Sequence, residues 1–139
     1  MKKIRAAVVG YGNIGQYTLQ ALEAANDFEV AGVVRRQGAK DKPAELEGYD
    51  VVADITELRD VDVAILALPT RECPAYAKRY LAMGINTVDS YDIHSGIVDY
   101  RAELMPVCKE HGRVSVISAG WDPGSDSIVR TLMQSLAPK

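Results

Sequence analysis

The sequence contains few of the residues that mark several large classes of protein. Among its 139 residues there are only two cysteines, Cys73 and Cys108, and neither belongs to a Cys-x-x-Cys pattern. A disulfide framework or a zinc ribbon needs more cysteines at closer spacing, so both are excluded, and the low content is typical of a reducing cytoplasm. We interpret the two cysteines as small hydrophobic side chains on helix faces, with no adjacent base to activate either thiol.

Long apolar runs and an excess of positive charge are also missing. No stretch approaches the roughly 18 apolar residues that a membrane span needs, and the apolar run after Arg5 ends at Gly10, too early for a signal peptide. The formal net charge of −3 argues against nucleic acid as the main partner. We therefore expect a cytoplasmic protein with no nucleic-acid partner, no membrane partner and no metal site.

The remaining composition is that of an ordinary globular domain. Hydrophobic residues make up 47% of the chain and charged residues 25%, which excludes disordered and fibrous proteins. The length favours one domain over residues 1–139. A chain of this mass buries roughly two thirds of its surface on folding, which is enough for a self-sufficient core.

Short apolar runs bounded by turn residues predict the strands of a parallel sheet. Strands that are apolar on both faces belong to sheets with helices on both sides. The runs lie at residues 6–9, 30–34 and 63–68, with shorter candidates at 51–53 (an edge strand), 87–89 and 114–117.

Helical patterns lie between these runs. They are found at Ile14–Ala25 (apolar spacing at Ile14, Thr18, Leu22 and Ala25), at 74–83 before Gly84, at 104–111 (where Pro106 begins or kinks the helix) and at 128–136. The alternation of strands and helices predicts an α/β fold with a doubly wound, mainly parallel sheet of Rossmann type.

A glycine-rich segment between the first strand and the first helix predicts a dinucleotide site. It fits G-x-G-x-x-G: the first glycine permits the tight turn, the second lets a pyrophosphate approach the backbone, and the third lets the helix pack closely on the sheet. Free N–H groups at the helix N-terminus would face the anion. A purely structural turn is the alternative. The predicted cofactor-binding residues are Gly10, Tyr11, Gly12, Asn13, Ile14 and Gly15.

Two arginines stand where the second strand ends, at the position of the carboxylate that usually binds the ribose 2′-hydroxyl of NAD. Guanidinium groups bind phosphate bidentately and keep their charge. Arg35 and Arg36 therefore favour NADP(H) over NAD(H), with simple solvation of the strand end as the alternative for Arg36. Leu68, Pro69 and Thr70 follow the central strand at the same edge and are further cofactor-binding candidates, although Thr70 could instead cap the next helix.

Two aspartates follow the last two strands at the carboxyl edge of the sheet. Asp92 lies in Ser90–His94, and Asp122 follows Trp121 in a loop framed by glycine and proline. Paired carboxylates attract an ammonium group, and one with a raised pKa could accept a proton during amine oxidation. We predict Asp92 and Asp122 as catalytic and substrate-binding residues and Trp121 as a substrate contact. The alternatives are an Asx-turn or helix cap for Asp122 and a core position for Trp121. His94 could relay protons, with a satisfied loop histidine as the alternative.

Together, GYGNIG, the arginine pair, TVDSYDIH and SAGWDPG resemble the amino-terminal half of meso-diaminopimelate dehydrogenases, from residue 4 to 136. The resemblance implies NADP-dependent, reversible oxidative deamination of meso-2,6-diaminopimelate at its D-centre to L-2-amino-6-oxopimelate and ammonia. It implies that Asp92, Trp121 and Asp122 contact the D-centre. The sequence departs from the family pattern at Ile93, usually polar, and at Gly96, usually acidic.

The family's second half supplies its homodimer interface and most contacts to the distal L-centre. We therefore expect a truncated cofactor domain that binds NADP(H) and turns over weakly or not at all. Two other functions stay open. One is a non-catalytic dinucleotide-binding or redox-sensing module, and the other is a dihydrodipicolinate-reductase-like NAD(P) enzyme, which would share the glycine loop but not GWDPG.

Overall fold

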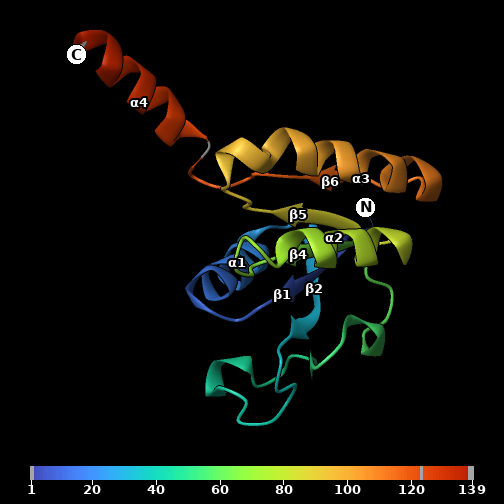
Figure 1. Cartoon of the computed structure of the whole chain (residues 1–139). Coiled ribbons are helices and arrows are strands. Elements are labelled where there is room, and N and C mark those ends of the chain that lie inside the picture. The colour runs from blue at the N-terminus through green and yellow to red at the C-terminus, as the bar shows by residue number, and fades with distance from the viewer. Residues whose placement is uncertain (1, 123, 138–139) are drawn as a thin grey trace.

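The computed structural model describes residues 2–122 and 124–137, in which strands and helices alternate along the chain (Figure 1). The strands are β1 (Ile4–Val9), β2 (Phe28–Val34), β3 (Val51–Val52), β4 (Val63–Leu66), β5 (Asn86–Asp89) and β6 (Ser115–Val116). The helices are α1 (Asn13–Ala24), α2 (Cys73–Ala82), α3 (Ile97–His111) and α4 (Ser125–Leu136), with 3-10 turns η1 (Ala44–Leu46), η2 (Ile55–Glu57) and η3 (His94–Gly96). Each predicted strand and helix is present. The largest difference is in α3, which begins already at Ile97, so that Pro106 lies inside it.

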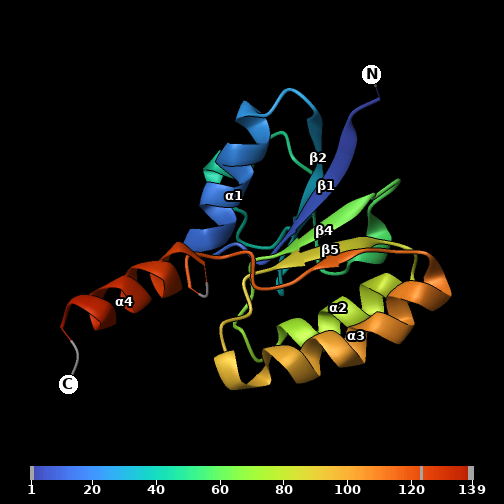
Figure 2. The same cartoon turned by 90° about the horizontal axis from the view of Figure 1, so that it is seen from above.

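The six strands form one sheet in the order β3-β2-β1-β4-β5-β6, and every neighbouring pair is parallel. The order runs outward from β1 in both directions, which is the doubly wound arrangement. Figure 2 shows α1 on one face of the sheet and α2 and α3 on the other. The predicted α/β fold of Rossmann type is therefore confirmed.

The hydrophobic core has one layer on each face of the sheet, and β1 contributes to both. Val8 belongs to the cluster that includes Leu19 and Leu22 of α1. Its neighbour Val9 belongs to the cluster that includes Leu81 of α2. Because both faces of β1 are covered, its sequence is a continuous apolar run instead of an alternating one, which made it recognisable.

The face that helix α1 turns to the sheet agrees in part with its sequence spacing. Its buried residues are Gly15, Leu19 and Leu22, whereas Ile14 is 61% exposed and Ala25 lies at the end of the helix. Of the predicted face, Leu22 is buried and Thr18 and Ala25 are half-buried, so only the placement of Ile14 was wrong. At Gly15 the helix lies close to the end of β1, since a Cβ there would lie 2.1 Å from the carbonyl oxygen of Gly10.

Helix α4 forms where the amphipathic pattern predicts a helix, but none of its residues is buried. Its apolar stripe includes Ile128, Leu132 and Leu136, which are 65%, 59% and 81% exposed. In Figure 1 the helix extends away from the rest of the molecule. Over the part of the chain that the structure describes, no helix is long and apolar enough to cross a membrane.

A capping interaction at η2 gives a testable contribution to stability. Asp54 accepts the backbone N–H of Thr56, Glu57 completes a capping box, and Arg79 of α2 donates to the Asp54 carboxylate at 2.7 Å. The hydrogen bond from Thr56, followed by that from Arg79, lowers the pKa of Asp54 to about 2. The carboxylate therefore stabilises the fold when it is ionised.

We expect Asp54→Asn to lower the free energy of unfolding by about 1 kcal/mol at pH 7, a value reduced for solvent screening of this partly exposed pair. Because the folded pKa is depressed, the contribution is complete above the unfolded value near 4. It disappears as the pH falls through about 2. Urea denaturation of both proteins at several pH values measures the difference. A constant difference from pH 7 to pH 2 would contradict this explanation.

Candidate functional site

A cleft of ≈ 540 Å³ opens at the carboxyl ends of β1, β2 and β4, where the strand order reverses. In open α/β sheets this switch point is where ligands bind. The cleft is lined by Val9, Gly10, Tyr11, Gly12, Val34, Arg35, Arg36, Gln37, Ala53, Ala67, Leu68, Pro69 and Tyr76.

The three glycines of the loop have different structural requirements. Gly10 has a φ of +95°, and a Cβ there would lie 2.3 Å from the carbonyl oxygen of Ala67. A Cβ at Gly15 would lie 2.1 Å from the carbonyl oxygen of Gly10. A Cβ at Gly12, in contrast, would meet no protein atom within 4 Å. The fold itself therefore needs glycine at positions 10 and 15 but not at 12, where the bare backbone leaves room for a ligand.

The N-terminus of α1 is open to an anion. Gly12 is its N-cap residue, no side chain caps the helix, and its first turn carries no acidic residue. The unpaired N–H groups of a first helical turn carry partial positive charge and bind phosphate groups readily. The local geometry therefore fits a pyrophosphate at this position.

The two arginines at the end of β2 differ in their partners. Arg35 donates to the carbonyl oxygens of Gly38 and Asp41 over 3.4–3.5 Å, at the limit of hydrogen bonding. Arg36 forms an ion pair with Glu72, with 2.8 Å between Nη2 and Oε1, and its side chain is 81% exposed. A phosphate ligand would therefore compete with a carboxylate for Arg36, but only with weak carbonyl contacts for Arg35.

The other predicted cofactor residues divide into two groups. Tyr11, Leu68 and Pro69 line the cleft, whereas Asn13, Ile14, Gly15 and Thr70 do not belong to its lining. Burial raises the pKa of Tyr11, so its phenol stays protonated near pH 7.

Thr70 does not cap α2. The N-cap residue of that helix is Glu72, with no side-chain cap, and Thr70 Oγ1 instead accepts the backbone N–H of Asp92 over 3.0 Å. The alternative of a Thr70 cap is therefore wrong. The contact joins the loop after β4 to the loop after β5, so Thr70 lies between the cleft and the aspartate-bearing loops.

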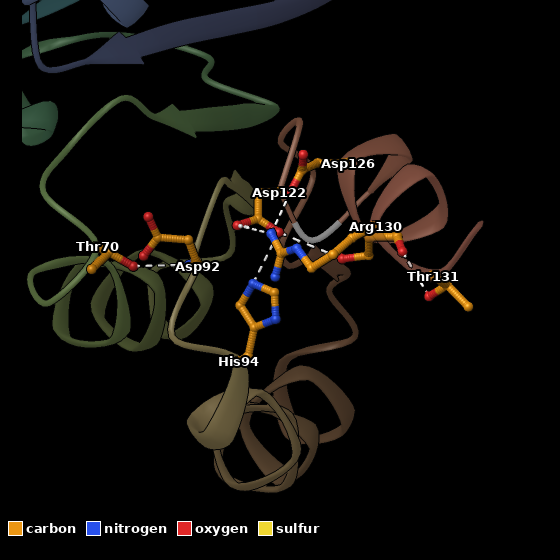
Figure 3. A network of polar contacts seen from close by, with 8 residues as sticks. Thr70, Asp92, His94, Asp122, Asp126, Arg130 and Thr131 are labelled. Carbon is orange, nitrogen blue, oxygen red and sulfur yellow. Dashed lines mark hydrogen bonds and ion pairs between the residues drawn. The ribbon is translucent and has the colours of Figure 1, made fainter. Parts of the chain in front are cut away.

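The two predicted aspartates lie on neighbouring loops, one after β5 and one after β6 (Figure 3). Asp92 is exposed. Asp122 Oδ1 lies 3.0 Å from Nε2 of His94, and Asp122 Oδ2 lies 3.4 Å from Nη2 of Arg130, which also pairs with Asp126. The helix-cap alternative for Asp122 is wrong, since the N-cap residue of α4 is Gly124, with no side-chain cap.

Trp121 is 69% exposed, so the alternative of a core position for this side chain is wrong. Its backbone carbonyl accepts the N–H groups of Gly124 and Asp126, which turns the chain into α4. Pro123, the remaining member of this motif, lies outside the described residues.

Several residues at the carboxyl edge of the sheet were not predicted from the sequence. Gln37, Ala53 and Tyr76 line the cleft, but they belong to a loop, a strand end and a helix with no recognisable spacing. The pairing of His94 and Arg130 with Asp122 was also missed, because it joins elements far apart in the sequence. The sign of this pairing in the sequence was His94, a basic residue two positions after Asp92.

The Cys73 thiol and the acidic side chains are further candidates for a reactive or metal-binding centre. Cys73 is fully buried, and burial raises the pKa of its thiol to about 12, which confirms its interpretation as a small hydrophobic side chain. Over residues 2–122 and 124–137, no three His, Cys, Asp or Glu side chains gather as metal ligands would.

The fold and the cleft define a dinucleotide-binding domain of Rossmann type. A model of the oxidoreductase family with an NAD-binding Rossmann fold matches residues 4–89, and the chain belongs to this family. The chain therefore has the NAD(P)-binding Rossmann fold of this family.

Within the family, the chain is similar to meso-diaminopimelate D-dehydrogenases. It is 70% identical to the one from Bacteroides fragilis over 139 residues, covering all of this chain and 46% of that protein. The solved diaminopimelate dehydrogenase of C. glutamicum in complex with DAP has a TM-score of 0.76 at 30% identity, over 98% of this chain and 42% of the other. An engineered D-amino acid dehydrogenase bound to NADP+ has a TM-score of 0.75 at 30% identity, over 97% and 42%.

These comparisons confirm the resemblance derived from the motifs. The chain spans slightly less than half the length of these relatives.

Proposed function

We propose that this chain is the NADP(H)-binding domain of a dehydrogenase that reversibly deaminates meso-2,6-diaminopimelate at its D-centre. The observation that carries the proposal is the position of Asp92 and Asp122 at the same sheet edge as the glycine cleft, on loops that cofactor binding alone does not require. The 70% identity to a meso-diaminopimelate D-dehydrogenase supports the choice of substrate. The rest of such an enzyme would supply the contacts to the L-centre and the dimer interface.

In this proposal the cleft binds NADP(H) at two positions, one for the pyrophosphate and one for the 2′-phosphate. The pyrophosphate lies against Gly12 and the first turn of α1, where no protein atom occupies the space of a Cβ. The 2′-phosphate lies at Arg35, whose present contacts are long and easily exchanged. Tyr11, Leu68 and Pro69 line the walls between them.

The aspartate loops hold the reacting amino group. Bound NADP+ would supply a hydride acceptor for the amino-bearing carbon, and loss of this hydride and of an N–H proton would convert the amine into an imine. Water then adds to the imine carbon, and the C–N bond breaks to release ammonia and leave a carbonyl group. We propose that Asp92 and Asp122 bind the ammonium group, that one of them takes its proton, and that Trp121 forms a wall of this subsite.

The cofactor preference is tested on the chain itself by fluorescence titration with NADPH and NADH. NADPH is expected to bind more tightly, and Arg35→Ala to remove most of that difference, weakening NADPH roughly tenfold through loss of charge-assisted hydrogen bonds. The matched variant Arg36→Ala is expected to have a smaller effect, because Glu72 already pairs with this arginine. Equal affinities for the two nucleotides in the unmodified chain would contradict the NADP assignment.

The reaction is tested in a chimera in which this chain replaces the matching 46% of the Bacteroides fragilis relative. We expect NADP+ reduction that depends on meso-diaminopimelate. A chimera that binds NADPH and has the thermal stability of the relative, yet does not reduce NADP+, would favour a non-catalytic dinucleotide-binding module.

A further inference from the structure

Asp89 is a buried carboxylate at the end of β5, with only 2% of its surface exposed. Its Oδ1 accepts the backbone N–H of Tyr91 over 2.9 Å and that of Ser118 over 3.1 Å. Its Oδ2 accepts the hydroxyl of Tyr100, in α3, over 2.7 Å. Three donors therefore surround the buried charge, which compensates the loss of water around it.

Two of the three donors, the N–H groups of Tyr91 and Ser118, belong to the loops that carry the candidate aspartates. Tyr91 immediately precedes Asp92 in the loop after β5, and Ser118 begins the turn that leads to Asp122 after β6. The backbone carbonyl of Asp89 also accepts the N–H of Ala119 over 2.8 Å. One residue thus contacts the backbone of both loops.

The second loop adopts its conformation under constraint. Ser118 has a φ of +58°, in the left-handed region that residues with a side chain rarely adopt. The loops are also close together, because a Cβ on Gly120 would lie 3.2 Å from Cβ of Ser90. A conformation of this kind persists only where surrounding contacts impose it, and Asp89 supplies such a contact at the N–H of Ser118.

We propose that Asp89 is a positioning residue, which fixes the separation of Asp92 and Asp122 and so the size of the ammonium subsite between the two loops. The inference rests on the proposed function for the identity of the substrate. The arrangement of the two loops around Asp89 does not depend on that function. Asp89 is too deeply buried to bind substrate itself. An apolar residue at this position would leave the N–H groups of Tyr91 and Ser118 without an acceptor, and buried donors without partners are strongly disfavoured.

The geometric part is tested by amide hydrogen exchange on this chain. In Asp89→Ala, exchange at Tyr91 and Ser118 is expected to accelerate at least tenfold more than at Ala119, whose acceptor is a backbone carbonyl. In Asp89→Asn the acceleration should stay below threefold, because the amide oxygen accepts the same two N–H groups and the amide nitrogen can donate to Tyr100. Equal acceleration at all three amides in Asp89→Ala would overturn the proposal.

The effect of Asp89 on the ammonium subsite is tested in the chimera, where the kinetic constants for meso-diaminopimelate and for NADP+ are measured separately. Asp89→Ala is expected to lower kcat/KM for meso-diaminopimelate at least tenfold while KM for NADP+ changes less than twofold, and Asp89→Asn should restore most of the loss. A parallel change in both parameters would indicate a general folding defect and overturn the proposal. An equal loss in Asn and Ala would indicate that the charge acts directly, and would overturn it too.

A second variant keeps the test decisive where Asp89→Ala does not fold. Gly120→Ala forces Ser90 and the facing loop apart and leaves the buried carboxylate intact. It should lower kcat/KM for meso-diaminopimelate at least threefold with KM for NADP+ unchanged, and an unaltered kcat/KM would count against the proposal. Failure of the proposed function is separately visible, because the unmodified chimera would then not reduce NADP+ with meso-diaminopimelate, whereas the exchange experiment on the chain would keep its meaning.

Discussion

Asp122→Asn in the chimera is expected to lower kcat for meso-diaminopimelate oxidation roughly a hundredfold or more, which is the usual contribution of a positioned acid or base. The asparagine has nearly the same shape, but it neither carries charge to attract the ammonium group nor accepts its proton. Steady-state NADPH formation with both substrates saturating measures the effect. Affinity for NADPH should stay within about twofold, since Asp122 does not line the glycine cleft.

Asp126→Asn is the matched control for this substitution. Asp126 pairs with the same Arg130, but it lies in the first turn of α4, past the loop that bears Asp122. We expect kcat of the Asp126→Asn chimera to remain within about threefold of that of the unmodified chimera. An Asp122→Asn variant that retains full turnover would remove Asp122 from the chemistry.

Gly12→Ala is expected to weaken NADPH binding roughly a hundredfold without lowering the thermal stability of the chain. The added methyl group meets no protein atom within 4 Å, and the backbone at Gly12, with φ of −87°, suits any residue. In the proposed complex, however, this methyl group occupies the space of the pyrophosphate. Titration with NADPH and thermal unfolding, both on the isolated chain, measure the two quantities.

Gly15→Ala, three residues further on, should instead lower the stability of the fold. Its Cβ would lie 2.1 Å from the carbonyl oxygen of Gly10, so α1 has to move away from the sheet. We expect a loss of unfolding free energy of about 3 kcal/mol or more, in the range of severe overpacking. If instead Gly12→Ala destabilised the fold and left NADPH affinity unchanged, the glycine loop would have a structural role only.

The fold could be predicted because its signals are local. The apolar run of β1, the glycine loop and the stop at Gly84 each report on a few consecutive residues, and a doubly wound sheet follows from their alternation. The buried face of α1 could be predicted only in part: the close packing at Gly15 and the burial of Leu22 were expected, but the exposure of Ile14 was not. The exposed stripe of α4 shows a similar limit, since amphipathic spacing predicts a helix but not what its apolar face meets.

The candidate site was predictable where residues follow strand ends and not where it depends on contacts between loops. Gly12 was predicted from the glycine pattern that follows the first strand, and Arg35 from its position where the second strand ends. The partners of Asp122 could not be found, because His94 and Arg130 approach it from η3 and α4. Asp89 also joins separate parts of the chain, since its three donors come from three separate segments.

The central claim is that the cleft at Gly12 and Arg35 binds NADP through its pyrophosphate and its 2′-phosphate. The most direct test is an NMR titration of the isotope-labelled chain with NADP+. We predict the largest shifts at the backbone amides of Gly12 and Asn13 and at the guanidinium of Arg35, with the Arg35 shift absent when NAD+ is added instead. Shifts confined to other surfaces, or none at saturating NADP+, would contradict the account.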